Sequence, residues 1–177
     1  MKPVGKMTVG ELAAFISSHL RQTGIDTVLS GGSCVSIYSA GKYVSKDLDF
    51  IQTGFATARK IRGAMLAIGF VYEHGNFTHP DTELLVDFPA GPLAVGKEPV
   101  AAIEEIRFST GMLRILSPTD CVKDRLAAYY HWEDLQCLEQ AVLVALANPV
   151  HLTEVRRWSD REGMSDGFEF FADRLER

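Results

Sequence analysis

The sequence predicts an α/β fold (α+β in its segregation): a small mixed β-sheet with helices on one face, followed by a helical C-terminal subdomain. Before residue 117, short apolar segments typical of strands alternate with segments that have helical periodicity. After it, only helical segments follow. The change comes at Ser117-Pro118-Thr119-Asp120, where a serine N-cap and a proline at the first helical position mark a helix start. We therefore expect an α/β domain at residues 1–116 and a helical subdomain at residues 117–177.

The first elements bring the chain to a pair of glycines. A helix over residues 8–23 opens with the capping box Thr8-Val9-Gly10-Glu11. Residues 27–30 are then expected to form a short strand that runs directly into Gly31-Gly32. A short helix is expected at residues 34–40.

The other elements follow from the same periodicities and turn signals. In the first part, strands are expected at residues 47–52, 70–73, 82–88 and 112–116, with a helix at 57–68 and a hairpin partner beginning at 77–78. Residues 89–110 are ambiguous, and there we expect a short helix at 101–105 and a strand at 106–108. In the second part, helices are expected at residues 117–131, 133–147, 153–162 and from 165 onward.

Two carboxylates in an apolar strand are the most informative feature of the chain. Asp47 and Asp49 are two residues apart, so on a strand both side chains point to one face, about 6.6 Å apart along the backbone. Two like charges placed side by side repel each other unless a cation lies between them. A hard dication with oxygen ligands, most simply Mg²⁺, satisfies both. The alternative is a solvated strand face.

A third carboxylate follows on a later strand. Asp87 ends the apolar run Glu83-Leu84-Leu85-Val86-Asp87-Phe88, and a lone aspartate there is costly to bury unpaired. If this strand lies beside the first, Asp87 can reach the same metal site. Three carboxylates around one pocket suit a two-metal phosphoryl-transfer centre. Alternatively, Asp87 caps the loop at Pro89.

The segment Gly31-Gly32-Ser33 has a structural and a functional interpretation. Glycine supplies a positive φ angle at a strand-to-helix turn. Small residues there also let a triphosphate approach the backbone, where amides at a helix N-terminus can receive it. This is no Walker A loop, because no Gly-Lys-Ser/Thr sequence follows.

Taken in order, these features resemble the nucleotidyltransferase fold of the DNA polymerase beta superfamily. The resemblance covers roughly residues 25–90 and rests on Gly31-Gly32-Ser33, the Asp47-x-Asp49 pair and Asp87 on a later strand. The segment at residues 117–126 resembles the helical tail of the minimal and abortive-infection-toxin branches of that family.

The resemblance implies an activity and a role for each residue. It implies a Mg²⁺-dependent enzyme, with Mn²⁺ as a substitute, that moves a nucleoside monophosphate from a nucleoside triphosphate such as ATP to a hydroxyl. Asp47 and Asp49 would hold two metal ions. Asp87 would hold the catalytic metal and help to deprotonate the attacking hydroxyl. Ser33 and its neighbouring amides, with Lys123, would bind the phosphates. The alternative for Lys123 is a solvated helix side chain.

Composition limits the class of protein. The 177 residues are enough for one domain or one α/β domain with a helical extension, and the net charge of −5 argues against tight, non-specific binding to long nucleic acids. The N-terminus shows no apolar segment with a cleavage site, and no apolar run approaches the ~20 residues that span a bilayer, so neither secretion nor membrane insertion is expected. Three cysteines without paired spacing fit reduced thiols in the cytoplasm.

Two further hypotheses stay open at this point. One is a catalytically silent nucleotide-binding or protein-interaction module on the same fold. The other is the toxin half of a toxin–antitoxin pair, with an antitoxin or a second copy of the chain as partner. The acceptor is not fixed by the sequence, and RNA, a protein hydroxyl and a small molecule all remain.

Overall fold

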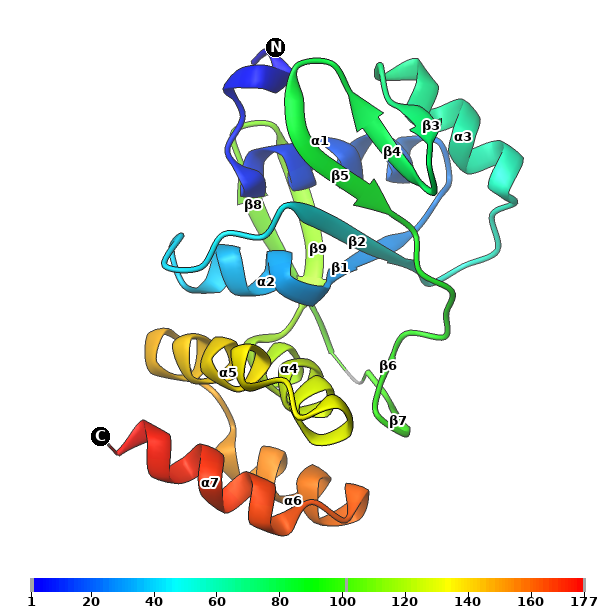
Figure 1. The fold of residues 1–177 in the computed structure, drawn as a ribbon. Helices are drawn as coiled ribbons and strands as arrows, with labels where there is room; N and C mark the ends of the chain where they lie inside the picture. Colours follow the sequence, from blue (N-terminus) through cyan, green and yellow to red (C-terminus); the bar gives the residue numbers. More distant parts are fainter. Residues whose placement is uncertain (1, 101, 177) are drawn as a thin grey trace.

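The computed structural model describes residues 2–100 and 102–176, and within them seven strands form one mixed sheet (Figure 1). The strand order is β3-β4-β5-β2-β1-β9-β8. The strands span β1 Thr27–Ser30, β2 Asp47–Gln52, β3 Val71–Glu73, β4 Asn76–His79, β5 Thr82–Asp87, β8 Ile103–Phe108 and β9 Gly111–Leu116, and a separate hairpin consists of β6 Ala94–Val95 and β7 Glu98–Pro99.

The helices divide between the two parts of the chain. A short 3-10 helix, η1, spans Val4–Lys6, and the α-helices that accompany the sheet are α1 Val9–Gln22, α2 Gly31–Tyr38 and α3 Ala58–Ala67. The C-terminal helices are α4 Pro118–Trp132, α5 Leu135–Ala147, α6 Leu152–Glu162 and α7 Ser165–Leu175. The predicted fold class is therefore confirmed. No helix in the described part of the chain is both long and apolar enough to cross a bilayer.

Parallel and antiparallel strand pairs meet at the centre of the sheet. β1 runs antiparallel to β2 and parallel to β9, while β2 runs parallel to β5. Strands β3, β4 and β5 form an antiparallel meander at one edge, and β8 and β9 form a hairpin at the other. The ends of β1 and β5 therefore flank the start of β2 in the middle of the sheet.

Helix α2 connects the two parts of the molecule. It starts immediately after β1, and α4 and α5 pack against it (Figure 1). Buried side chains from both parts, such as Leu29 of β1, Val35 of α2 and Leu126 of α4, belong to one continuous core. The division at residue 117 stays a prediction, because β9 ends at Leu116 and α4 begins at Pro118 but the core does not end there.

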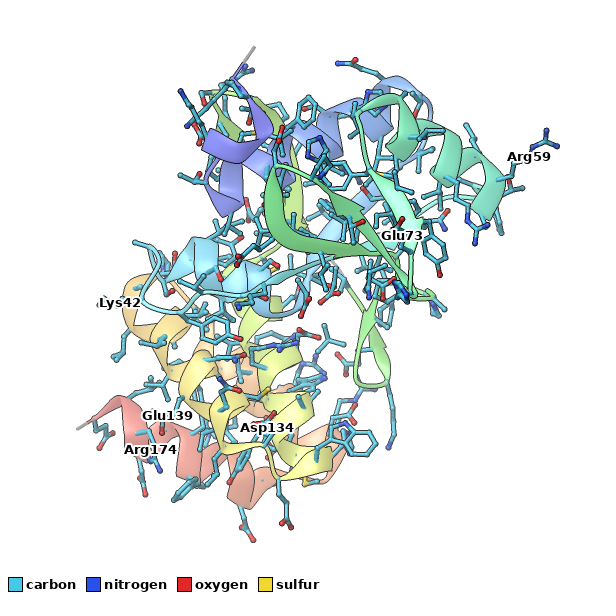
Figure 2. The ribbon with its side chains drawn as sticks, turned by 45° about the horizontal axis from the view of Figure 1, so that its top comes forward. Lys42, Arg59, Glu73, Asp134, Glu139 and Arg174 are labelled. Carbon is cyan, nitrogen blue, oxygen red and sulfur yellow. The ribbon has the colours of Figure 1, made fainter. Side chains whose placement is uncertain are left out.

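The C-terminal helices pack through buried aromatic residues. Trp158 and Phe171 are fully buried and Phe168 nearly so. The ring of Tyr130 stacks on Trp158 with 5.8 Å between centroids. At the surface, Glu139 of α5 and Arg174 of α7 lie together as an ion pair (Figure 2). These contacts make α4–α7 one packed unit.

The hairpin of residues 94–99, which we call the strap, ties the sheet to α6. The indole N–H of Trp158 donates to the carbonyl of Val95 at 3.2 Å, and the backbone N–H of Lys97 donates to Glu162 at 2.9 Å. The Glu98 carboxylate lies 2.7 Å from Arg157 and 2.9 Å from Arg161. Because the strap follows β5 closely in the sequence, it links the end of β5 to the helical part.

The strap, a segment around residue 103 and the start of α2 differ from the sequence-based expectation. The helix expected at residues 101–105 is wrong where the chain is described: residues 103–108 form β8, which pairs with β9 from Ile103↔Leu116 to Phe108↔Gly111. Residue 101 lies outside the described residues. Pairing with a distant strand overrides the local helical preference of this segment. Helix α2 also starts at Gly31, three residues before its expected start at residue 34.

Candidate functional site

The three predicted aspartates lie on neighbouring strands at the centre of the sheet. Asp47 and Asp49 belong to β2 and Asp87 ends β5, and the parallel register places Asp49 directly beside Asp87. Paired residues of adjacent strands project from the same face, and side chains two residues apart on one strand do so as well. The condition under which Asp87 can reach the other two aspartates is therefore met, because β2 and β5 are neighbours and the three carboxylates share one face.

The raised pKa of Asp49 shows that placing the three carboxylates together has an electrostatic cost. Partial burial, followed by the negative charges of Asp47 and Asp87, raises the pKa of Asp49 to about 6 from its usual 3.8. Burial disfavours a charged carboxylate, and like charges nearby disfavour it further. Without a bound cation, Asp49 therefore holds a proton up to nearly neutral pH.

Gly31 is required at its position for two reasons. Its φ angle is +70°, in the left-handed region that favours glycine. A Cβ atom there would also lie only 2.5 Å from Oδ2 of Asp49. The backbone at the start of α2 thus lies directly against the Asp49 carboxylate, as it could not if residue 31 had a side chain.

The first turn of α2 faces this site with its amides uncapped. In the described structure Ser30, the N-cap residue, makes no side-chain hydrogen bond to the helix. Its hydroxyl donates instead to the Asp49 carbonyl at 3.3 Å. The N–H groups at residues 31–33 thus have no side-chain cap, and a helix N-terminus carries partial positive charge.

Serine hydroxyls hold the start of β2 in place. Ser33 is fully buried and its hydroxyl donates to the carbonyl of Asp47. Ser45 donates to the same carbonyl at 3.1 Å and accepts from the Asp47 N–H at 3.2 Å. In this structure the Ser33 hydroxyl therefore positions β2, and its expected contact with phosphate stays a prediction. Ser45 was missed in the sequence, where only its position two residues before Asp47 could have indicated it.

Lys123 lies elsewhere than expected. It is buried, with Nζ 2.7 Å from Glu154 and 3.5 Å from Asp120. These partners belong to α6 and to the first turn of α4, so the side chain is neither solvated nor directed by them toward the aspartates. It borders a hollow of about 630 Å³ between α4, α6 and β8, and the three aspartates are not among the residues that line this hollow.

Arg125, which the sequence reasoning passed over, is the cation of α4 that acts on the site. Its charge lowers the pKa of Asp49, against the larger effects of burial and of the neighbouring aspartates. Two residues along a helix turn a side chain by about 200°, so Arg125 and Lys123 face opposite ways. Arg125 pairs with Asp124 at 2.5 Å and donates to Gln140 of α5 at 3.4 Å. Its side chain is mostly buried, and the sequence alone did not indicate which basic residue of α4 is buried toward the site.

The three carboxylates carry the negative charge that a divalent cation requires, but their side chains do not form a complete coordination site. Three carboxylates share a face, and burial together with their repulsion raises the pKa of Asp49. In the part of the chain that the structure describes, however, no three His, Cys, Asp or Glu side chains converge into a group that could hold a metal ion. The carboxylate of Asp87 accepts the N–H of Phe88 at 2.7 Å. A metal here would therefore need further oxygen ligands from a substrate.

Comparison with solved structures finds similar folds. An antigenic nucleotidyltransferase-like protein from Paracoccidioides brasiliensis aligns with a TM-score of 0.54 at 13% identity, over 91% of this chain and 92% of that one. The antibiotic-resistance factor ANT(2'')-Ia, in its solution structure, also aligns with a TM-score of 0.54 at 13% identity, over 95% of this chain and 94% of that one. No family model matches the sequence, and no curated protein matches it.

These likenesses cover nearly the whole chain, including the helical part. At this level of identity they show a nucleotidyltransferase-like fold and nothing about activity. The expected resemblance is confirmed for the fold, whereas the abortive-infection-toxin branch is not shown.

We predict that Gly31→Ala lowers stability more than Gly41→Ala does. Both glycines have positive φ angles, +70° and +80°, so both substitutions carry the same backbone strain. Only at residue 31 would the new methyl meet a carboxylate, since a Cβ on Gly41 has nothing within 4 Å. Thermal denaturation of the two variants measures the difference. Equal losses would show that Asp49 does not lie against this backbone.

We also predict that Asp49→Asn stabilises the metal-free protein in a pH-dependent manner. Because the folded pKa of Asp49 is raised to about 6, its favourable contribution is complete below about pH 4 and is lost as pH rises through 6. Asparagine does not ionise and escapes this loss. The melting temperature of the variant in EDTA should match wild type near pH 4 and exceed it above pH 7. A difference that is constant with pH would contradict the like-charge grouping.

Proposed function

We propose that the chain transfers a nucleoside monophosphate from a nucleoside triphosphate to an acceptor hydroxyl. The observation that carries the proposal is the placement of Asp47, Asp49 and Asp87 on one face, with Asp49 against the N-terminus of α2. Phosphate anions favour a helix N-terminus, and cations favour a cluster of carboxylates. Triphosphate and carboxylates can therefore occupy one site only when cations separate them.

In this proposal the triphosphate binds at the first turn of α2. The amides of Gly31, Gly32 and Ser33 have no side-chain cap in the described structure and would donate to phosphate oxygens. Gly31 and Gly32 allow the phosphates to approach the backbone closely. The buried Ser33 hydroxyl contributes indirectly, because it fixes the carbonyl of Asp47 and with it the start of β2.

The metal ion belongs to the same proposal. Asp47, Asp49 and Asp87 would hold Mg²⁺, or Mn²⁺ in its place, with phosphate oxygens completing the coordination. Bound there, the cation supplies positive charge that offsets the carboxylate repulsion and the charge of the leaving pyrophosphate. The hydroxyls of Ser33 and Ser45 donate to the Asp47 carbonyl and hold the start of β2, and with it the two aspartates, in place.

The transfer step needs one base. The acceptor oxygen forms a bond to the α-phosphorus, and the bond from that phosphorus to its bridging oxygen breaks, so that pyrophosphate leaves with the electron pair. The proton of the acceptor hydroxyl passes to a carboxylate, and we assign this role to Asp87, which lies at the end of β5 beside Asp49. A positioned base contributes typically 10²–10⁴-fold to such a step.

Arg125 is the cation that we assign to the helical side of the site. Its charge lowers the pKa of Asp49, whereas the charge of its partner Asp124 raises it, and Asp124 and Gln140 hold the guanidinium in place. Lys123 has its charge matched by Asp120 and Glu154. A role in a toxin–antitoxin pair is supported only by the sequence resemblance.

We expect Mg²⁺ with a nucleoside triphosphate to raise the melting temperature, and the triphosphate with EDTA to have little effect. Stabilisation at a ligand concentration 100 times Kd is about 2.7 kcal/mol. Labelled triphosphate should then be transferred to an acceptor in total RNA or cell protein, and Asp87→Asn should abolish the transfer while Mg²⁺-nucleotide binding persists. Binding without transfer by the wild-type protein would favour the silent module, and no binding would remove the proposal.

We expect Arg125→Gln to weaken binding of the Mg²⁺-nucleotide and Lys123→Met to leave it nearly unchanged. Loss of a hydrogen bond to a charged group costs about 1.5–3 kcal/mol, which is roughly 10- to 150-fold in Kd. Lys123→Met should instead lower thermal stability, because it leaves Asp120 and Glu154 without their cation. Calorimetric titration of both variants, after circular dichroism confirms folding, decides between them. The reverse order of Kd values would restore the phosphate role of Lys123.

A further inference from the structure

Strand β8 forms one edge of the sheet, and in the described part of the chain no strand pairs with its outer side (Figure 1). Its 6 residues pair with β9 in an unbroken register, without a bulge. Natural edge strands are protected by bulges, by proline, by shortness or by charged side chains. Strand β8 has neither a bulge nor a proline, and its charges are of both signs. Such an edge can accept a further strand.

The backbone groups of alternate residues in β8 point outward. On β9, Met112 donates its N–H to the Ser18 hydroxyl at 2.7 Å and accepts from that hydroxyl at 3.1 Å, so its backbone groups point away from β8. Facing residues of an antiparallel pair point their backbone groups either both inward or both outward. Arg107 faces Met112, so its N–H and C=O point away from β9, as do those of Glu105 two residues earlier. In the described structure these outward groups make no hydrogen bond to the rest of the chain.

The charges of β8 select one way in which two copies of it can pair. When two identical antiparallel strands are related by a twofold axis perpendicular to the sheet, the axis passes through one residue of each strand, which faces its own copy. An axis at Glu104, Glu105 or Arg107 would place like charges directly opposite each other, which is destabilising. An axis at Ile106 instead places Glu105 of each copy opposite Arg107 of the other, so that opposite charges face each other twice.

The pairing centred on Ile106 also uses groups that the chain leaves available. Glu105 and Arg107 are the residues whose backbone groups point outward, so each facing pair closes two ladder hydrogen bonds. Across residues 2–100 and 102–176, Arg107 has no acidic partner within ion-pair distance, and Glu105 has only the exposed pair with Arg21 at 3.0 Å. Ile106 is partly buried and borders the hollow between α4, α6 and β8. A second Ile106 across the axis would cover part of this apolar side chain.

Outward backbone groups, self-complementary charges and an apolar centre on one strand fit a second copy of the same strand. We propose that the chain forms a twofold dimer in which β8 of each protomer pairs antiparallel with β8 of the other, centred on Ile106. The two sheets then become one. Strands β9 and β1 separate β8 from β2, which carries Asp47 and Asp49, so the interface and the aspartates lie on different strands. The dimer does not depend on the proposed reaction.

The test uses two charge variants that complement each other. Glu105→Arg makes positions 105 and 107 both positive, and Arg107→Glu makes both negative, so each variant faces like charges in its own dimer. Each variant alone should therefore have a dimer Kd about tenfold or more above that of wild type. An equimolar mixture of the two should form a heterodimer with a Kd within about threefold of wild type, because every facing pair again joins opposite charges. Sedimentation equilibrium over a concentration series measures these values.

The control variant is Glu104→Arg, because residue 104 faces Phe108 in this register. It should change the dimer Kd less than about threefold, and circular dichroism verifies that each variant is folded. Wild-type protein that stays monomeric throughout the concentration series would overturn the proposal, as would a mixture that associates no better than its two components. Loss of the dimer in Glu104→Arg to the same extent as in Arg107→Glu would overturn the register centred on Ile106.

Discussion

The confinement of three negative charges to one face of the sheet is the constraint on which the rest of the site depends. Asp49 is partly buried between Asp47 and Asp87, and its raised pKa records the cost of that position. The surroundings are built to keep it there. Gly31 leaves room for its carboxylate, and Ser33 holds the strand that carries it. The uncapped amides of α2 and the charge of Arg125 are the compensating positive features.

The site is also shared between the two parts of the chain. The carboxylates come from the sheet and Arg125 from α4, so the helical part is needed to complete the electrostatics. Helix α2 makes this arrangement possible, because its N-terminus lies at the aspartates while its sides pack on α4 and α5. One short helix therefore positions its own uncapped N-terminus and the helix that carries Arg125 together.

The sequence predicted those features that depend only on residues close together in the chain. The two-residue period of a strand places Asp47 and Asp49 on one face, and glycine at residue 31 indicates a positive φ angle. The choice between Lys123 and Arg125 was not accessible, because the rotation of α4 about its axis depends on packing against α2 and α5. Residues 103–105 were expected to be helical but pair with β9, as do residues 106–108, where a strand was expected. The strap was missed for the same reason, since two-residue strands carry no periodicity.

The strap gives the molecule a dependence on its ionic surroundings. Glu98 joins it to Arg157 and Arg161 through pairs that are partly open to water, and such pairs weaken as electrolyte concentration rises. The bond from Trp158 to Val95 is buried and is screened much less. Concentrated salt would therefore loosen the outer half of this tether while the inner half stays attached. In such a solution the Trp158–Val95 hydrogen bond would be the main tie between the strap and α6, while the continuous core keeps the sheet and the helices together.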